Sequence, residues 1–389
     1  MNVLKLAKQI QPEVVEFRRE LHAHPELSMQ ETETTCRVQR ELDKMGIGYR
    51  KLNPTGLVAE IRGTQAESSH CVLIRADMDA LNIQEETGLS FASENSGVMH
   101  ACGHDTHTAM LLGAATLLNQ QKHLFAGTVR LVFQPAEETG EGAKLAIAQG
   151  AADGAEMGMA LHIYSDWPTG VLRARKGPAA ASTDKFKITV TGKGCHGAAP
   201  NQGADPIYAG AAIVQNLQSM VSREFWPVDP IVVSVCQFHA GDRFNVIPET
   251  AVLEGTCRTF DHEIWEKIPE VMERIAQNTA AALKCEVKVE FDRVTMPLNC
   301  DARVADILKG AILKVVDHPS QFSESPIQMG GEDFAAFGDK IPIAWVQLGA
   351  NGGAPMHSSK VNFDENAFPY GVACYVQFAL DALHALSSR

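Results

Sequence analysis

The amino-acid sequence predicts an α/β protein in which a smaller α+β domain is inserted into a larger domain built on a mainly parallel sheet. The chain of 389 residues is long enough for one large domain and a smaller one. Strand-like and helix-like segments alternate up to residue 162, as is typical of parallel α/β sheets. Beyond residue 182 the order becomes β-α-β-β-α-β, the pattern of a ferredoxin-like sandwich. We therefore expect a first domain over residues 1–181 and 295–389 and an inserted domain over residues 182–294.

The first domain begins with a helical pattern and continues with clear strands. Apolar residues recur at helical spacing from Lys5 to Leu42, and Pro25 within the segment 22–26 indicates a turn between two helices. The segment 71–76 is almost entirely apolar, as expected for a central strand that is buried on both faces. The other expected elements are strands at 57–62, 129–134 and 157–161 and helices at 106–119 and 142–150.

The inserted domain shows a different order of strands and helices. After residue 296 the first domain resumes, and a further central strand is expected at 341–348. The elements expected in the inserted domain are strands at 186–191, 231–239, 251–259 and 287–291 and helices at 206–222 and 264–283.

Composition and charge exclude several classes of protein. The hydrophobic share of 45% and the charged share of 21% are those of an ordinary globular enzyme. A net charge of -13 repels phosphate, so it opposes binding to nucleic acid or to an anionic membrane. The N-terminal stretch lacks the continuous apolar run of a secretion signal, and no segment reaches the roughly 20 apolar residues that span a bilayer. The 9 cysteines are scattered and odd in number, which does not suggest a disulfide framework, so we expect a cytoplasmic protein.

Several predicted strands of the first domain end in acidic residues or in histidine. Because the carboxyl ends of neighbouring parallel strands lie at one edge of a sheet, ligands gather in the crevice beyond them. We therefore expect a functional site at this edge. The residues at these strand ends are Asp77, Asp79, Glu137, Glu138 and His162.

A short cysteine and histidine motif is compatible with metal binding. Cys102 and His104 stand on either side of a glycine in an expected turn, so that both side chains can face one cation. A thiolate and an imidazole form a good ligand pair for zinc or a similar metal. An isolated motif of this kind is equally compatible with a buried structural cysteine beside a capping histidine.

The adjacent acidic residues Glu137 and Glu138 suit metal-assisted hydrolysis. On an irregular turn their carboxylates can diverge, so that one binds a cation while the other transfers protons. A solvated acidic turn is the common alternative, but the position at the end of an apolar strand weighs against it. His162 and His357 are each compatible with an ordinary hydrogen-bonded histidine. Together with the cysteine, the first histidine and one carboxylate, they would supply enough ligands for two cations.

A series of motifs spread over almost the whole chain stands in the order found in one enzyme family. These motifs are Arg18–Ser28, Ile74–Leu81, Met99–Asp105, Gln134–Glu138, Leu161–His162, Phe244–Pro248, Gly330–Phe334 and Met356–Ser359. In them the chain resembles the branch of zinc-peptidase-like, two-metal amidohydrolases that contains indole-acetyl-amino-acid hydrolases, hippurate hydrolases and aminoacylases. The resemblance implies a three-layer α/β/α catalytic domain with an inserted ferredoxin-like domain that acts in dimerisation and as a lid.

The resemblance also implies roles for individual residues. Glu137 would be the general base and acid, and Asp79 would orient a ligand from outside the metal site. Relatives outside this branch carry a histidine at the position of Asp77, and Cys102 would compensate for that lost ligand. Two divalent cations per subunit, manganese or zinc with cobalt or nickel as alternatives, would be held by Cys102, His104, Glu138, His162 and His357.

For the inserted domain, the resemblance implies two further site residues. His196 would reach the active site of a partner subunit and stabilise the oxyanion, and Asn245 would contact the substrate amide or carboxylate. From the residues alone, both are equally compatible with turn residues in flexible loops. The chain departs from the family at Cys195, where glycine is usual, and at Asn82, where proline is usual. The first departure bears on the shape of the lid loop.

The activity implied by the resemblance is hydrolysis of N-acyl amino acids, such as hippurate, N-acetyl amino acids or auxin conjugates, by a homodimer or a higher homo-oligomer. A dipeptidase or carboxypeptidase acting on short peptides is an alternative. Two others are an amidase in which Cys102 is the nucleophile and a non-catalytic metal-binding relative. The sequence leaves the particular substrate open, because loops and the inserted domain shape the pocket.

Overall fold

The computed structural model describes residues 2–388, which divide into two compact units. The smaller unit contains Ala180–Leu298 and Ile327–Glu332, and the larger unit contains the rest of the described chain. The sequence had predicted a smaller domain of residues 182–294 alone, without the segment Ile327–Glu332. It belongs to the smaller unit because the backbone N–H of Ala181 donates to the carbonyl of Gln328 at 3.0 Å.

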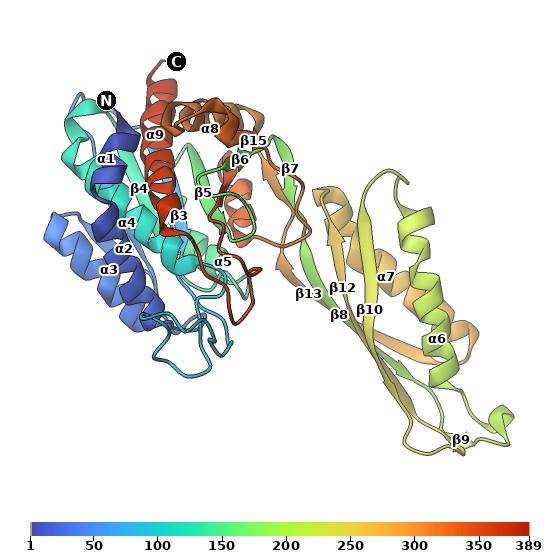
Figure 1. Cartoon of the computed structure of the whole chain (residues 1–389). Helices are drawn as coiled ribbons and strands as arrows, with labels where there is room; N and C mark the ends of the chain where they lie inside the picture. The colour runs from blue at the N-terminus through green and yellow to red at the C-terminus, as the bar shows by residue number, and fades with distance from the viewer. Residues whose placement is uncertain (1, 389) are drawn as a thin grey trace. The chain divides into compact units, whose positions relative to one another are not determined.

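The larger unit is built around an 8-stranded mixed sheet (Figure 1). Its middle strands β4, β3, β5 and β16 run parallel to one another, whereas antiparallel pairs occur toward both edges. β3 is buried along its whole length, which explains the continuous apolar run in its sequence. In sheet order the strands are β1 (Tyr49–Lys51), β2 (Leu57–Arg62), β4 (Thr128–Gln134), β3 (Cys71–Asp77), β5 (Met157–Tyr164), β16 (Ile343–Gly349), β6 (Leu172–Ala174) and β15 (Phe322–Glu324).

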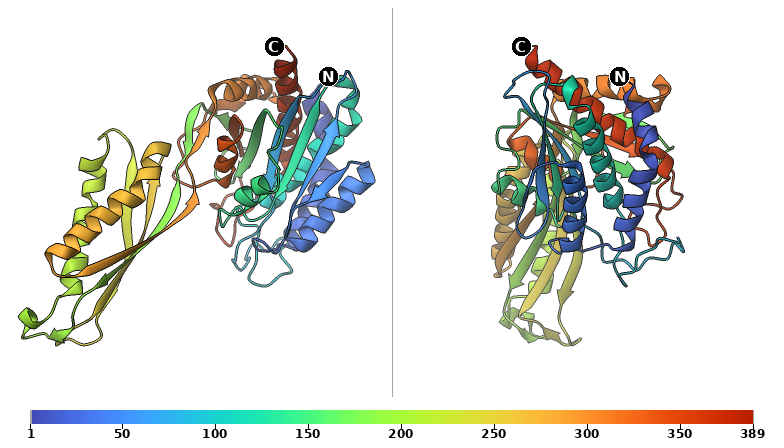
Figure 2. Two further views of the ribbon diagram at one scale, coloured as in Figure 1. Left: turned by 180° about the vertical axis from the view of Figure 1, so that it is seen from behind. Right: turned by 90° about the vertical axis from the view of Figure 1, so that its left-hand side faces the viewer.

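Helices cover both faces of this sheet. α4 and α9 pack against β3 and against each other, whereas α5 and the 3-10 segment η5 lie over the opposite face (Figures 1 and 2). The predicted three-layer α/β/α arrangement is therefore confirmed. No helix within residues 2–388 is long and apolar enough to cross a membrane. The helical segments of this unit are α1 (Val3–Gln9), α2 (Gln11–Ala23), α3 (Thr32–Met45), α4 (His104–Gln120), η1 (Lys122–Leu124), α5 (Gly142–Ala148), α8 (Ala302–Val315), η4 (Pro319–Gln321), η5 (Asp333–Asp339), η6 (Glu365–Ala367) and α9 (Phe368–Ser387).

The N-terminal helical region contains one break more than the sequence indicated. α2 ends at Ala23, before Pro25, as predicted. However, α1 ends at Gln9, and Ile10 separates it from α2, whose first turn contains Pro12. Proline fits the first turn of a helix but cannot donate a hydrogen bond within a continuous one. The spacing of the apolar residues alone therefore predicted one helix where the backbone forms two.

The smaller unit is an antiparallel sheet with α6 and α7 on one face (Figure 1). Its strand order is β10-β12-β8-β13, which confirms the predicted ferredoxin-like fold. The core between the sheet and the helices includes the buried residues Ile188, Ile213, Leu253 and Ile268. α6 is shorter than expected, because a π-helical turn follows it. The elements are β8 (Thr183–Thr191), β9 (Cys195–His196), η2 (Pro200–Gln202), α6 (Pro206–Leu217), η3 (Met220–Glu224), β10 (Ile231–Ala240), β11 (Val246–Ile247), β12 (Thr250–Thr259), α7 (His262–Ala282) and β13 (Glu286–Thr295), and the short strands β7 (Gly177–Ala180) and β14 (Leu298–Cys300) lie at the junctions of the chain.

A buried ionic network fixes the start of α4. The Asp105 carboxylate accepts a hydrogen bond from Arg18 Nε and lies beside His22 Nδ1, both at 2.8 Å, and all three side chains are buried. Burial opposes ionisation, yet Arg18 and His22 hold the pKa of Asp105 well below its usual range. Because Arg18 and His22 belong to α2, the network ties α2 to the first turn of α4.

Replacement of Asp105 by asparagine is expected to lower the free energy of unfolding of the larger unit by about 3 kcal/mol, because the buried Arg18 guanidinium loses its closest anionic partner. Urea unfolding followed by circular dichroism measures the change. The control is Asp306→Asn at the exposed ion pair with Lys176, which should change stability by less than about 1 kcal/mol. An equal effect of the two substitutions would contradict a structural role for the network.

Candidate metal centre

The five residues expected to bind metal come together from separate segments of the larger unit. Cys102 lies in the turn before α4, and His104 is the first residue of that helix. Glu138 follows β4, His162 belongs to β5, and His357 lies in the loop after β16. β5 extends beyond His162, which therefore lies inside a strand and not after its end. The carboxyl edge of the parallel strands thus carries the candidate site, as the sequence indicated.

The turn between Cys102 and His104 requires the glycine at position 103. Gly103 has a φ of 87°, and a Cβ atom there would lie 2.5 Å from Ile163 Cγ2. Only glycine adopts this conformation without strain and allows this close packing. The backbone N–H of His357 donates at 2.8 Å to the carbonyl of the residue before Cys102, which brings the last loop to the same turn.

The potential ligand atoms lie close to one another. Cys102 Sγ is 3.5 Å from His162 Nε2 and 3.3 Å from His357 Nε2. Glu138 Oε1 is 3.8 Å from His357 Nε2 and 3.9 Å from His104 Nε2. Side chains at these distances can share cations, and thiolate, imidazole and carboxylate are together a ligand set suited to zinc or a similar transition metal.

Two of these atoms have unmet bonding capacity. Within residues 2–388, neither His104 Nε2 nor Glu138 Oε1 has a hydrogen-bond partner, although both atoms are buried. The second nitrogen of His104, Nδ1, lies 3.1 Å from Asp79 Oδ1. His162 Nδ1 donates to the carbonyl of Ile163 at 2.7 Å, which leaves its Nε2 free to bind a cation. Metal-binding histidines are typically held in this way by a carboxylate or carbonyl on the far nitrogen, so the residues fit a metal.

Burial raises the pKa of two of the candidate ligands, Cys102 and Glu138. Burial raises the pKa of the Cys102 thiol well above its ordinary value, and the Glu138 carboxylate adds to the effect. Burial likewise raises the pKa of Glu138 to about 7, although His104 opposes the shift. A cation would bind to the deprotonated forms, so its binding releases protons and becomes weaker at lower pH.

Asp79 connects two of the candidate ligands without belonging to the cluster itself. Its carboxylate lies beside His104 Nδ1 and accepts from the backbone N–H of Glu138 at 3.1 Å. It also accepts from the Ser28 hydroxyl at 2.7 Å. The side chain is fully buried, so these contacts fix the positions of both candidate ligand residues.

The sequence reasoning missed His107, which lies one helical turn after His104. His107 Nδ1 donates to Asp77 at 2.6 Å, and its Nε2 accepts the backbone N–H of Ile163 at 2.8 Å. Asp77 also accepts from Arg75 at 2.6 Å. Because both ring nitrogens of His107 already form hydrogen bonds, His107 is not itself available to a cation. It instead holds Asp77 and the backbone next to His162 in place. The spacing of two histidines by three residues in a helix was the available signal, since such residues share a face.

Glu137 borders the ligand cluster. Its Oε2 is 4.0 Å from His104 Nε2, and its Oε1 accepts from the backbone N–H of Asp333 at 3.3 Å. Asp333 was not expected to have a role. Its carboxylate accepts from Gln134 Nε2 at 2.8 Å and from the backbone N–H of Ala143 at 2.8 Å. These bonds connect η5 to both ends of the segment that carries the two glutamates.

His196 and Asn245 lie together in the smaller unit. β9 pairs with β11, and the backbone N–H of Gly197 donates to the carbonyl of Asn245 at 2.8 Å. Both side chains are exposed. His196 Nδ1 accepts from the backbone N–H of Ala198 at 3.1 Å, so its Nε2 carries the proton of the neutral ring.

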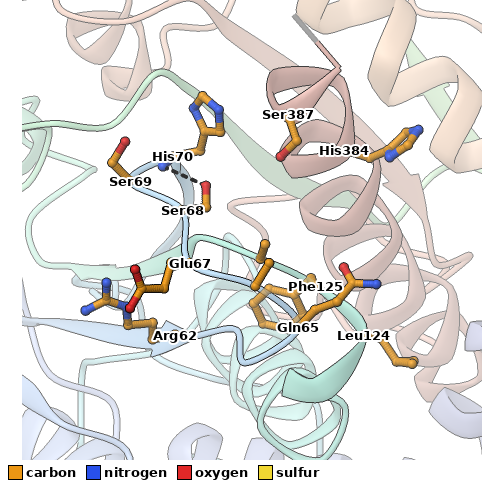
Figure 3. A pocket seen from close by; sticks show the side chains of 12 residues that line it. Arg62, Gln65, Glu67, Ser68, Ser69, His70, Leu124, Phe125, His384 and Ser387 are labelled. Atoms are coloured by element: carbon orange, nitrogen blue, oxygen red, sulfur yellow. Dashed lines mark hydrogen bonds between the residues drawn. The ribbon is translucent and has the colours of Figure 1, made fainter.

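A separate hollow of about 890 Å³ lies beside the C-terminal helix α9 (Figure 3). Its wall includes His70, Phe125 and His384. The residues that line it include none of the candidate ligands, so it is distinct from the metal centre.

Residues 73–381 match the peptidase family M20/M25/M40, and the chain belongs to this family. It is a metal-dependent amidohydrolase of the aminoacylase type. It is 38% identical to N-acetylcysteine deacetylase of Bacillus subtilis over 97% of this chain and 99% of that protein. It is 38% identical to thermostable carboxypeptidase 1 of Saccharolobus solfataricus over 96% of both chains. A solved structure of a dinuclear-metal-binding M20 peptidase of Bacillus subtilis is 36% identical and superposes with a TM-score of 0.86 over 97% of this chain and 99% of that one. The family resemblance in the motifs is thus confirmed.

Proposed function

We propose that the protein hydrolyses the amide bond of N-acyl amino acids and releases a carboxylic acid and a free amino acid. The observation that carries this proposal is the convergence of the five donor side chains, with Glu137 at their edge, in a chain similar to an N-acetylcysteine deacetylase. Two divalent cations, manganese or zinc with cobalt or nickel as alternatives, would be held by Cys102, His104, Glu138, His162 and His357.

Each of the surrounding residues has a defined task in this proposal. The bound cations would supply a Lewis acid for the amide carbonyl and a lowered pKa for the attacking water. Glu137 takes the proton of that water and returns it to the leaving amine. Asp79 holds His104 and Glu138 in place through the contacts described above.

The smaller unit would contribute substrate contacts. His196 can donate from Nε2 because its Nδ1 already accepts a backbone N–H, and a donor of this kind stabilises a developing oxyanion. Asn245, which directly precedes β11 beside His196, would bind the substrate amide or carboxylate. In the proposed dimer, His196 of one subunit serves the metal centre of the other.

Cleavage of peptides is a second candidate activity, because the carboxypeptidase relative is as similar to the chain as the deacetylase. A nucleophilic role for Cys102 is less well supported. A thiol nucleophile requires a lowered pKa, whereas burial raises the pKa of this thiol. A non-catalytic relative would have lost the base or a ligand, and the chain retains all of these residues.

A panel of substrates tests the proposed activity. Purified protein is assayed with N-acetyl, benzoyl and indole-acetyl amino acids and with unblocked short peptides, each with added Mn²⁺, Zn²⁺ or Co²⁺. We expect at least one acyl amino acid to be cleaved faster than the corresponding dipeptide. Faster cleavage of the peptides would favour the carboxypeptidase alternative. If no acyl amino acid is cleaved with any of the metals, the proposal fails.

The proposed homodimer would form through the smaller unit. Its strand β10 lies at the edge of the sheet and pairs with one neighbour, β12. Val232 on this strand is 37% exposed. An exposed apolar edge strand is a template for pairing with another chain. Other large apolar side chains exposed in this unit include Tyr208, Trp226, Val228 and Phe238.

Val232→Lys is expected to shift the protein from dimer to monomer, because a lysine on an edge strand opposes pairing. Analytical ultracentrifugation at several protein concentrations measures the shift. Lys288→Gln on β13, at the other edge of the sheet, is the control and should leave the mass unchanged. Wild-type protein that stays monomeric at all concentrations would refute the dimer.

A further inference from the structure

Glu31 is a buried carboxylate that no part of the proposed mechanism uses. It directly precedes α3, and its side chain is fully buried in the larger unit. A buried carboxylate is costly unless hydrogen bonds satisfy it, so its partners indicate its purpose.

The Glu31 carboxylate joins three segments that are distant in sequence. Its Oε1 accepts from the backbone N–H of Ala136 at 2.8 Å and from that of Met29 at 3.1 Å. Its Oε2 accepts from the hydroxyl of Thr55 at 2.6 Å. Burial raises the pKa of Glu31, and the charge of Asp79 adds to this effect, whereas the hydrogen bonds from Thr55 and from the backbone N–H of Ala136 oppose it by favouring the ionised form.

The partner Ala136 has an unusual backbone conformation. Its φ is 52°, in the left-handed region that residues with a side chain rarely adopt, and it is fully buried. Such a conformation persists only where the surroundings hold it, and it is typical of functional sites. Ala136 directly precedes Glu137, so its backbone sets the direction in which both glutamates leave β4.

The packing around this turn leaves little room for any other arrangement. A Cβ atom on Gly142 would lie 1.6 Å from the carbonyl oxygen of Pro135, and one on Gly56 would lie 2.7 Å from Pro135 Cδ. The backbone N–H of Gly142 donates to the carbonyl of Ala136 at 3.0 Å. The conformation of Ala136 is therefore held in two ways. The Glu31 carboxylate accepts the hydrogen bond from its N–H, and the close packing of Gly56 and Gly142 restricts the surrounding backbone.

We propose that Glu31 is a positioning residue, which holds the left-handed turn at Ala136 and thereby places Glu137 and Glu138 at the metal centre. This inference rests on the proposed function in one respect, since it takes Glu137 as the base and Glu138 as a ligand. Glu31 itself contacts neither the substrate nor a cation in this account.

Substitutions at Glu31 can separate two possible roles of its side chain: the hydrogen bond that it accepts from Ala136 and its negative charge. A glutamine can keep an oxygen for the two backbone N–H groups, while its amide donates to the Thr55 hydroxyl, which then accepts. An aspartate retains the charge but is shorter by one methylene, so it no longer reaches Ala136. An alanine leaves both backbone N–H groups buried without their acceptor.

The experiment compares Glu31→Gln, Glu31→Asp and Glu31→Ala, with Thr55→Val as the matched control that removes only the third hydrogen bond. For each folded variant, kcat and KM are measured with the best acyl amino acid substrate. The affinity of the metal-depleted protein for Mn²⁺ alone is measured by competition with a chelating indicator. Circular dichroism and thermal melting establish folding.

We expect Glu31→Asp and Glu31→Ala to lower kcat by about 100-fold with little change in KM, as small misplacements of catalytic groups do. We expect them to weaken Mn²⁺ binding by about 10- to 100-fold. Glu31→Gln and Thr55→Val should stay within about threefold of wild type in both measurements, since the bonds to Ala136 persist.

The proposal is overturned if folded Glu31→Asp keeps wild-type kcat and Mn²⁺ affinity, or if Glu31→Gln is as impaired as Glu31→Asp. The aspartate variant decides the matter even if the alanine variant does not fold. If the wild-type protein cleaves no acyl amino acid, the proposed function fails, while the Mn²⁺ affinities still test whether Glu31 positions Glu138.

Discussion

Glu137→Gln is expected to lower kcat by about 100- to 10,000-fold, the range that a general acid and base typically contributes. The substitution keeps the shape of the side chain and its contact with the backbone N–H of Asp333. It removes the ability to take a proton from water and to return it to the amine. Because Glu137 borders the ligand cluster and is not one of the five donors, the protein should still bind both metal ions.

The measurement combines steady-state kinetics with metal analysis by mass spectrometry on the same preparation. Glu141→Gln is the control, because this exposed glutamate stands just before α5 and should behave as wild type. Full activity of Glu137→Gln would refute its role as the base. Loss of metal together with activity would show instead that Glu137 is a ligand.

Cys102→Ala is expected to weaken metal binding by more than about 100-fold and to lower activity accordingly. Loss of a residue that only hydrogen-bonds a metal ligand typically costs about 10- to 100-fold in affinity, and loss of the ligand itself should cost more. Its sulfur lies within 3.5 Å of two histidine nitrogens, so it stands at the middle of the donor set. Isothermal titration of metal-depleted protein with Zn²⁺ measures the change. Cys236→Ser, at an exposed cysteine of the smaller unit, is the control.

The same titration has an expected pH dependence. Burial raises the pKa of the Cys102 thiol and raises that of Glu138 to about 7, and both groups bind a cation only after losing their protons. The affinity for metal should therefore fall as the pH decreases through 7, with more protons released per ion bound. Cys102→Ala should show a shallower dependence. An affinity that is independent of pH between 6 and 8 would contradict these assignments.

Much of the fold could be predicted because its strongest sequence signals come from burial. β3 is buried on both faces, so its sequence is a continuous apolar run, and the carboxylate at its end marks the edge where ligands gather. The strand order of the smaller unit likewise followed from its β-α-β-β-α-β pattern. The convergence of the five donors was expected from the family motifs, since His162 and His357 are unremarkable when considered singly.

The supporting residues could not be predicted in the same way. His107, Asp333 and Glu31 act through backbone groups that are distant in sequence, and no local pattern shows which N–H groups the fold will bring to them. The break between α1 and α2 was missed for a related reason, because both helices bury apolar residues at similar spacing and only the proline marks the interruption.

Titration of metal-depleted protein with Mn²⁺ or Zn²⁺, while the hydrolysis of an N-acyl amino acid is followed, tests the central claim most directly. We expect no hydrolysis in the absence of metal and a rise in activity that reaches its plateau when two ions are bound per chain. Hydrolysis that survives exhaustive chelation, and is lost when the thiols are alkylated, would contradict the metal-dependent mechanism and favour Cys102 as a nucleophile.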